Sequence, residues 1–285
     1  SFHFSLSGGE PTFHPGYLTI LKYLADDVVN TNYTSIHMTS NCSRNMKWFE
    51  QYVEYAKPFH RASITASLHT EHLNTTEKMQ EFADKLIFCQ EHDVQITINM
   101  VMVPSWFEKD WENALFFHNQ GINVTLKPQS DPTASRVVDG YTDEMLQRLW
   151  NGMPQMAYTE QKRKWNARPR PSFELPPYAI GENDASVPWH MQIEFTDSKG
   201  KKWYMDQAER FNAFNFNKFE GWSCNSGYQG IIIREPDGSI KRSYSCYDVP
   251  LGNIETGFKL FDKPMPCISP SCVSSADSKI PKRKI

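Results

Sequence analysis

Strand-like and helix-like segments alternate along the first half of the sequence, and this alternation constrains the fold more than any other feature. Strand-like runs begin near residues 2, 34, 61, 94 and 122. Helix-like runs fill the intervals at residues 15–28, 45–56, 75–91 and 107–119. The repeat is about thirty residues, the length of one strand, one helix and their connections. The sequence therefore predicts an α/β fold in which five parallel strands are joined by right-handed helical crossovers.

The predicted strands alternate apolar with polar side chains, whereas strands buried on both faces normally read as continuous apolar runs. The third strand has an apolar face made by Ile64, Ala66 and Leu68. Its polar face comprises Ser63, Thr65, Ser67 and His69. Helices must cover the apolar face, and burying the polar groups without partners would cost about 1–3 kcal/mol each. We therefore expect a wide or incomplete barrel around a polar ligand or water, although an antiparallel sheet with one solvated face would alternate similarly.

The third helix-like run has the clearest signals. Asn74 can cap its start, and Glu77 then completes a capping box. Its apolar stripe consists of Met79, Phe82, Ala83 and Leu86. Cys89 falls on the same stripe, so we expect a buried thiol in the core there and not a ligand.

Composition excludes several classes of protein. With 285 residues, 39% hydrophobic and 13% aromatic, the chain can bury a substantial core. A formal net charge of −3 gives no electrostatic case for a nucleic acid or an anionic membrane as partner. No apolar run is long enough to span a bilayer, so a membrane location is not expected. The chain opens with Ser1 inside a strand pattern, and we expect further sequence upstream.

Six cysteines are too few for a disulfide scaffold in a chain of 285 residues. Four of them are gathered in the last quarter, with 21, 20 and 4 residues between successive members: Cys224, Cys246, Cys267 and Cys272. Such clustering predicts a metal site in a reducing compartment, and hence a cytoplasmic protein. Spacing alone does not separate zinc from an iron–sulfur cluster, and two disulfides are a further alternative.

Gly8-Gly9-Glu10 follows the first predicted strand and precedes a helix, the position at which open α/β sheets and barrels bind ligands. Two glycines let the backbone approach a ligand closely, and Glu10 adds a charge. Alone, the motif is a weak signal and favours a plain tight turn over a ligand site.

Taken with its context, this stretch resembles the radical S-adenosylmethionine superfamily. The segment from Ser5 to Thr12 is similar to the second strand and the Gly-Gly-Glu motif of that family. In the family this motif holds the methionine amino group, largely through backbone atoms. The resemblance thus implies that Gly8, Gly9 and Glu10 bind S-adenosylmethionine.

The likeness extends over most of the chain, with less specific matches at later strand ends. It implies further cofactor-binding positions at Thr39, Asn41, Ser67, His69, Asn99 and Leu126. Ser67, His69 and Asn99 would reach the ribose or carboxylate, and backbone near Leu126 would meet the adenine. The implied fold is a partial (β/α)6-type barrel. The implied activity is that of an oxidoreductase that cleaves S-adenosylmethionine to a 5′-deoxyadenosyl radical, which abstracts hydrogen from a substrate.

One family feature is missing from this sequence. The family binds its catalytic 4Fe-4S cluster through a loop with three cysteines after the first strand, spaced by three and then two residues. No such triplet occurs here. We expect the first strand and this loop to lie before Ser1, so that the fragment alone would be inactive.

The cysteine-rich end resembles auxiliary-cluster modules of the SPASM or twitch type. Pro236-Asp237-Gly238 lies between two strand-like runs and predicts a hairpin. The resemblance implies a small α+β module with one auxiliary iron–sulfur cluster on Cys224, Cys246, Cys267 and Cys272. Val273-Ser274 replaces a further cysteine that the fuller pattern often has.

These features predict a truncated barrel over residues 1–157, a connecting or lid region over 158–220, and the auxiliary module over 221–285. An electron donor and an unknown substrate, either a peptide or protein or a small molecule, are the implied partners. Two alternatives remain open. One is a zinc-stabilised binding protein that kept the barrel without catalysis. The other is a metal-free α/β enzyme that uses His3, His37 or His69 for acid–base chemistry.

Overall fold

The structure is a computed structural model that describes residues 2–27, 34–130, 137–151, 153, 193–196, 202–205, 217–234, 237–246, 249–278 and 280–284. The chain divides into two compact units. The N-terminal unit contains β1–β5 and α1–α5, and the C-terminal unit contains β6–β14 and α8. Each unit is described by itself.

The N-terminal unit is built on one five-stranded sheet, with the order β1-β2-β3-β4-β5. Its strands are β1 (Phe2–Leu6), β2 (Thr34–Ser40), β3 (Arg61–Leu68), β4 (Val94–Met102) and β5 (Asn123–Pro128). Its helices are η1 (Pro11–Phe13), α1 (Tyr17–Asp27), α2 (Met46–Ala56), α3 (Thr76–Glu91), η2 (Pro104–Trp106), α4 (Phe107–Asn119) and α5 (Asp143–Asn151). All four strand pairs are parallel. The predicted parallel α/β sheet is therefore confirmed, and the antiparallel alternative is wrong.

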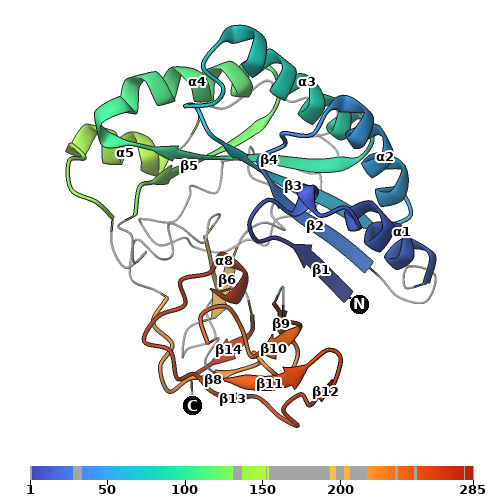
Figure 1. The fold of residues 1–285 in the computed structure, drawn as a ribbon. Coiled ribbons are helices and arrows are strands. Elements are labelled where there is room, and N and C mark those ends of the chain that lie inside the picture. Colours follow the sequence, from blue (N-terminus) through green and yellow to red (C-terminus); the bar gives the residue numbers. More distant parts are fainter. Residues whose placement is uncertain are drawn as a thin grey trace. The chain divides into compact units, whose positions relative to one another are not determined.

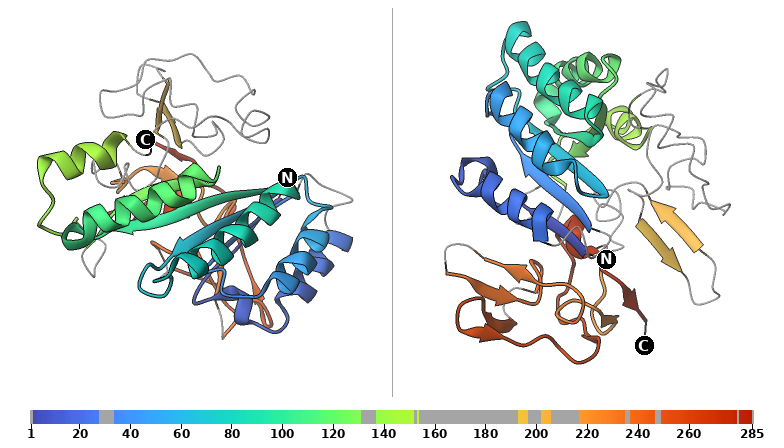
Figure 2. Two further views of the ribbon diagram at one scale, coloured as in Figure 1. Left: turned by 90° about the horizontal axis from the view of Figure 1, so that it is seen from above. Right: turned by 90° about the vertical axis from the view of Figure 1, so that its right-hand side faces the viewer.

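Helices α1–α4 lie along the same face of this sheet (Figure 1), as two further views also show (Figure 2). Crossovers of one hand that always step to the next strand in the same direction place every helix on one side. The opposite face is left without helices from these crossovers. That face carries the polar side chains predicted from the sequence.

The core lies between the sheet and its helices. Burial alternates along β2 and β3, so that Ile36, Met38 and Ile64 are buried while the polar residues between them are not fully covered. The helices contribute large buried side chains such as Phe49 and Leu86. Each fully buried side chain of this size contributes about 1.5–3 kcal/mol to the stability of the fold. This gain explains why the alternation of apolar and polar residues determines which face of each strand points to the helices.

Helix α3 begins at a different cap from the one predicted. Its N-cap is Thr75, whose side chain accepts a hydrogen bond from the backbone N–H of Lys78. Asn74 instead accepts a hydrogen bond from the Lys78 ammonium. The capping box with Asn74 is therefore wrong, because a Thr hydroxyl one residue later reaches the free N–H groups of the first turn. The prediction for Cys89 is confirmed, since its side chain is fully buried in the core.

The C-terminal unit is made of short strands. They are β6 (Ile193–Thr196), β7 (Lys202–Met205), β8 (Ser223–Cys224), β9 (Ile232–Ile233), β10 (Ser239–Lys241), β11 (Pro250–Asn253), β12 (Gly257–Phe258), β13 (Met265–Pro266) and β14 (Lys282–Arg283), with helix α8 (Ser275–Ser278). They form sheets ordered β12-β11-β10-β9, β13-β8-β14 and β6-β7. The predicted hairpin is confirmed: β9 and β10 pair antiparallel, and Gly238 takes a φ of +64° in the turn.

The predicted boundaries after residues 157 and 220 stay predictions, because most of residues 158–220 lie outside the described residues. None of the helices in the described ranges is long and apolar enough to cross a membrane.

Candidate functional site

Parallel pairing brings the carboxyl ends of β1–β5 to one edge of the sheet, and the predicted cofactor-binding residues lie at that edge. They are Gly8, Gly9, Glu10, Thr39, Asn41, Ser67, His69, Asn99 and Leu126. Five of them follow a strand directly or within a few residues, and the other four, Thr39, Ser67, Asn99 and Leu126, lie one to three residues before the end of one. This is the edge at which α/β proteins bind their ligands.

The turn after β1 has a backbone conformation that glycine favours. Gly8 has a φ of +107° and Gly9 a φ of +50°. A Cβ atom added at either residue would meet no other atom within 4 Å. Glycine is needed here for the backbone conformation and not for close packing, and the open space leaves room for a ligand beside the backbone.

The Glu10 carboxylate joins the ends of β1 and β2. Its Oε1 accepts hydrogen bonds from the Thr12 backbone N–H (3.1 Å), the Thr12 hydroxyl (2.6 Å) and the Ser40 hydroxyl (2.8 Å). Its Oε2 accepts one from the backbone N–H of Asn41 (2.6 Å). Thr12 and Ser40 are buried. Both carboxylate oxygens are thus engaged within the protein, so Glu10 positions the strand ends.

Arg44 extends this network and was not singled out from the sequence. Its Nε donates to the carbonyl oxygen of Thr12 at 2.9 Å, and its guanidinium lies 5.1 Å from the centre of the Phe13 ring. A single Arg after the second strand carries no motif that would have identified this contact. The Asn41 side chain forms a local turn by accepting from the backbone N–H of Ser43.

Strand register groups the remaining predicted residues in rows across the uncovered face. Ser67 pairs with Asn99, and Asn99 pairs with Thr125, so these three polar residues are cross-strand neighbours. Thr39 lies in the preceding row, opposite Thr65. Leu126 differs from the others, because its side chain is buried in the core and only its backbone can serve a ligand at this edge.

The histidines predicted as alternative acid–base groups lie in two places. His3 and His37 face each other with ring centres 6.5 Å apart, hydrogen bonded to Ser35 and Ser63 respectively. His69 is half exposed at the carboxyl end of β3 and lies 3.4 Å from a carboxylate oxygen of Glu71.

Asp110 and Tyr141 brace the other side of the edge, and sequence reasoning missed both. Asp110 is buried and accepts hydrogen bonds from the Val103 backbone N–H and, at the long distance of 3.5 Å, from the Thr70 hydroxyl. Burial raises the pKa of Asp110 above its usual value. The Tyr141 hydroxyl donates to the carbonyl oxygen of Met102 and accepts from the backbone N–H of Gln129, which ties the ends of β4 and β5 together.

The four clustered cysteines lie in the C-terminal unit, and all are buried as free thiols. The Cys267 thiol is hydrogen bonded to those of Cys246 and Cys272. Cys224 lies in β8, where it pairs with Met265, two residues before Cys267. Its sulfur accepts a hydrogen bond from the backbone N–H of Ser226 at 3.4 Å. The two-disulfide alternative is not the state seen in the structure.

The pKa values of three of these thiols are shifted in opposite directions. A hydrogen bond from Cys246, and to a smaller extent one from Cys272, holds the pKa of Cys267 far below its usual range. The same bond to Cys267, with burial, raises the pKa of Cys246 and of Cys272. The arrangement therefore favours one thiolate, held between two thiol donors.

Thiolates are suitable ligands for soft metals, but the thiols here hydrogen bond to one another. Across the described residues, no group of three or more His, Cys, Asp or Glu side chains has the arrangement that holds a metal ion. The donor set is chemically suited to a soft metal, but the four cysteines do not form such a group in the described structure.

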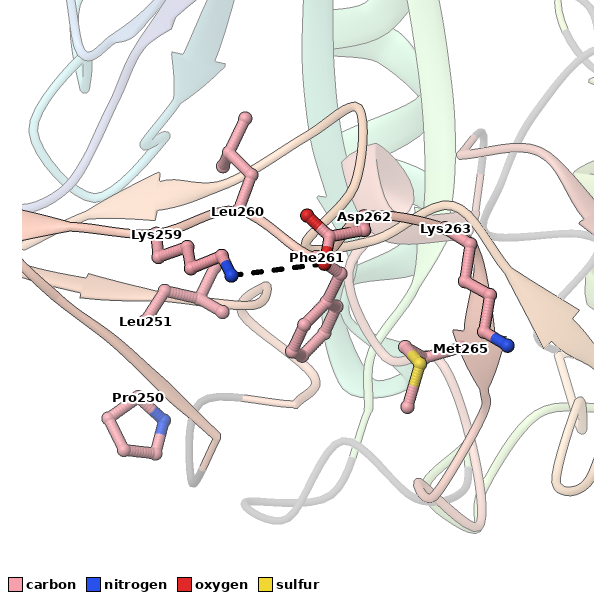
Figure 3. A pocket seen from close by; sticks show the side chains of 8 residues that line it. All are labelled: Pro250, Leu251, Lys259, Leu260, Phe261, Asp262, Lys263 and Met265. Carbon is pink, nitrogen blue, oxygen red and sulfur yellow. Dashed lines mark ion pairs between the residues drawn. The ribbon is translucent and has the colours of Figure 1, made fainter.

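An open pocket of about 440 Å³ lies beside the cysteine loop of the C-terminal unit. Its lining comprises Pro250, Leu251, Lys259, Leu260, Phe261, Asp262, Lys263 and Met265 (Figure 3). Lys259 and Asp262 face each other across its rim at 3.8 Å, and both are largely exposed. The pocket is open and mixed in character, and none of its lining residues is a nucleophile or a recognised acid–base pair.

Together, these features define an α/β protein with a sequentially ordered parallel sheet, a glycine turn open at its carboxyl edge, and a separate unit with buried thiols. No protein-family model matches the chain, and none of the curated proteins is significantly similar to it.

Proposed function

We propose that this chain belongs to a radical S-adenosylmethionine enzyme with an auxiliary iron–sulfur module. The observation that carries the proposal is the glycine turn after β1. Gly8 and Gly9 have positive φ values and open space beside them, at the edge where a ligand is expected. Glu10 holds this turn against the end of β2.

The sheet supports a partial barrel as the site of that ligand. Its five strands follow one another in sequence, and the crossover helices leave one face to polar side chains. A sheet of this order curves around its uncovered face when it forms part of a barrel. Rows such as Ser67, Asn99 and Thr125 would then line the inside of the barrel and bind the polar groups of the cofactor.

The C-terminal thiols support an auxiliary cluster by their chemistry. Four buried cysteines in one unit, a backbone N–H donating to Cys224, and a low pKa at Cys267 all favour thiolate ligation of a soft metal. Loading would replace the hydrogen bonds among Cys246, Cys267 and Cys272 by bonds to metal.

When bound beside S-adenosylmethionine, the catalytic cluster supplies the electron that yields methionine and a 5′-deoxyadenosyl radical, which takes a hydrogen atom from the substrate. The residues of this chain bind, orient and exclude water. Backbone at Gly8 and Gly9 would hold the amine of the cofactor, and the Ser67–Asn99 row would orient its ribose or carboxylate. The proposal requires a three-cysteine loop encoded before Ser1, an electron donor, and a substrate that is a peptide or protein or a small molecule.

The test is made on the full-length protein, purified without oxygen. We expect about eight irons per chain, four for each cluster. On addition of a reductant and S-adenosylmethionine, 5′-deoxyadenosine should appear by liquid chromatography. A Gly8→Val variant should lose this product while it keeps its iron, because a branched side chain disfavours the φ of +107° and occupies the open space.

The matched control is Gly257→Val in the C-terminal unit, where φ is +105° and the space beside the residue is equally open. It should form 5′-deoxyadenosine at the wild-type rate. A colourless full-length protein that holds zinc and no iron would overturn the proposal and favour a zinc-stabilised binding protein. An iron-loaded, reduced protein that forms no 5′-deoxyadenosine would also overturn it.

A further inference from the structure

The pocket shown in Figure 3 adjoins an open edge of a sheet. In the four-stranded sheet of the C-terminal unit, β12 is the last strand in the order, and among the described strands it pairs with β11 alone. Just after β12, Lys259 donates its backbone N–H to the carbonyl oxygen of Leu251 at 2.9 Å. The backbone groups of successive residues in a strand point to opposite sides. Those of Phe258 and Leu260 therefore point away from β11, towards the open edge.

The apolar part of the pocket lining is held in place by the C-terminal unit itself. The backbone N–H of Phe261 donates to the carbonyl oxygen of Gly227 at 2.9 Å, and the Phe261 ring centre lies 5.7 Å from the guanidinium carbon of Arg242. Arg242 is buried and donates to the carbonyl oxygen of Met265 at 3.0 Å. These contacts shape the pocket before any ligand arrives, so binding there loses little conformational entropy.

The rim of the pocket carries more positive than negative charge. Lys259 and Lys263 both line it, and Asp262 is the one carboxylate among the lining residues. Lys259 and Asp262 lie 3.8 Å apart with side chains that are 82% and 87% exposed, so solvent screens this pair and it contributes little. Over residues 217–285 the sequence has ten Lys and Arg and seven Asp and Glu, although the net charge of the whole chain is −3. The pocket therefore favours a negatively charged partner.

Large apolar side chains remain exposed along the same edge. Phe258 is 48% and Leu260 is 41% exposed. An open strand edge with apolar side chains invites pairing with another chain, and a lysine beside it disfavours partners that lack a compensating negative charge. A second copy of this edge would bring Lys259 against a lysine of the same sign. Backbone, apolar surface and charge thus all fit one occupant, an extended and acidic polypeptide segment.

We propose that the edge of β12 and this pocket bind an extended acidic segment of a peptide or protein. The segment would add a strand beside β12, with its backbone bonded to Phe258 and Leu260. One of its large apolar side chains would enter the pocket against Phe261, and its carboxylates would pair with Lys259 and Lys263. In strand addition the main-chain bonds provide affinity and the pocket provides specificity. The inference goes beyond the proposed function, since it requires neither iron nor S-adenosylmethionine.

Fluorescence anisotropy of short labelled peptides, added to the full-length protein, tests the chemistry of the partner. The first peptide alternates Glu with Leu, and the second alternates Lys with Leu. The third is the Glu–Leu peptide with a methyl group on every backbone nitrogen, which removes the donors that a new strand needs. The Glu–Leu peptide should bind about tenfold more tightly than either of the others, and more weakly as salt increases. If it does not bind, or binds no better than the second or the third peptide, the proposal is wrong.

Substitutions at the pocket locate the binding. Leu260→Ser and Lys259→Glu should each weaken binding of the Glu–Leu peptide by about tenfold, and Lys259→Glu should also improve binding of the Lys–Leu peptide. Phe258→Pro removes an N–H that points to the open edge and should weaken binding too. The first two variants change exposed side chains, so they test the proposal even if Phe258→Pro does not fold.

Two matched controls lie in the same unit outside the pocket lining. Ile233→Ser removes an apolar side chain that is 51% exposed on β9, at the opposite edge of the same sheet. Lys218→Glu reverses an exposed charge. Both should bind the Glu–Leu peptide as the wild type does. If either control weakens binding as much as Leu260→Ser and Lys259→Glu do, the peptide does not bind at β12 and the proposal is overturned.

Discussion

Replacing Glu10 by Ala should separate the ends of β1 and β2 and destabilise the N-terminal unit. The substitution removes four hydrogen-bond acceptor contacts, two of them to Thr12 and the others to Ser40 and Asn41. The Ser40 hydroxyl and the Thr12 side chain are buried, so water cannot fully replace the lost acceptor.

The magnitude follows from the number and kind of these bonds. Hydrogen bonds to a charged group contribute about 1.5–3 kcal/mol each, and a buried donor left unsatisfied costs about 1–3 kcal/mol. Glu10 is partly exposed and the two Thr12 bonds are local, so the four contributions do not add. We expect Glu10→Ala to lower the free energy of unfolding by about 3 kcal/mol. Glu10→Gln keeps one acceptor oxygen and should lower it by about 1–2 kcal/mol.

Urea unfolding, followed by circular dichroism on the full-length protein, measures the free energy of unfolding. Hydrogen exchange at the Asn41 amide reports on the β1–β2 contact itself, and it should accelerate in both variants. Glu50→Gln, on the exposed surface of α2, is the control and should change stability by less than about 0.5 kcal/mol. If Glu10→Ala unfolds at the wild-type urea concentration and the Asn41 amide stays protected, the carboxylate does not hold the two strand ends together.

Three further predictions concern other parts of the chain. Gly252→Ala should destabilise the C-terminal unit by about 2 kcal/mol or more, because its Cβ would lie 2.4 Å from the Gly257 carbonyl oxygen. Gly257 has a similarly positive φ, but a Cβ there would meet no other atom, so Gly257→Ala should destabilise the unit less. Thermal unfolding compares the two variants. The raised pKa of Asp110 means that folding disfavours its ionised form, so the free energy of unfolding of Asp110→Asn should rise relative to that of the wild type as the pH increases above 3.8. Urea titrations at low and neutral pH test this. A stability difference in favour of Asp110→Asn that shrinks with rising pH would contradict it. Cys267→Ala should lose the iron of the auxiliary site. Cys89→Ala should keep this iron and lose only about 1 kcal/mol of stability from core packing. An equal iron content in the two variants would disprove the assignment of the ligands.

The sheet could be predicted because its signals are local. Apolar and polar residues alternate along Arg61–Leu68 and along other strands of the sheet, and the segments repeat about every thirty residues. These two patterns predicted which side chains face the helices, and the structure agrees. The cap of α3 was wrong by one residue because Asn74 and Thr75 are both good caps, and only the geometry of the first turn chooses between them.

The contacts that brace the candidate sites could not be predicted, because they join residues far apart in sequence. Asp110 reaches Thr70 across 40 positions, and Arg242 reaches Pro266 across 24. Neither residue lies in a spacing pattern that a single sequence makes visible. The clustering of four cysteines in the last quarter was visible in the sequence, but the buried Arg242 guanidinium that donates to the carbonyl oxygens of Met265 and Pro266, just before Cys267, was not.

The engagement of Glu10 changes how the Gly-Gly-Glu turn would recognise a ligand. Because both carboxylate oxygens already accept hydrogen bonds within the protein, an incoming amine must be bound mainly by backbone oxygens around Gly8 and Gly9. Stability and binding should then separate. Gly8→Ala should weaken binding of S-adenosylmethionine, measured by calorimetry, because a side chain at a φ of +107° strains or shifts the ligand-facing backbone. Glu10→Gln should weaken binding less, although it disturbs the contacts to Ser40 and Asn41. The reverse order would mean that the carboxylate itself binds the ligand and leaves Ser40 and Asn41 to do so.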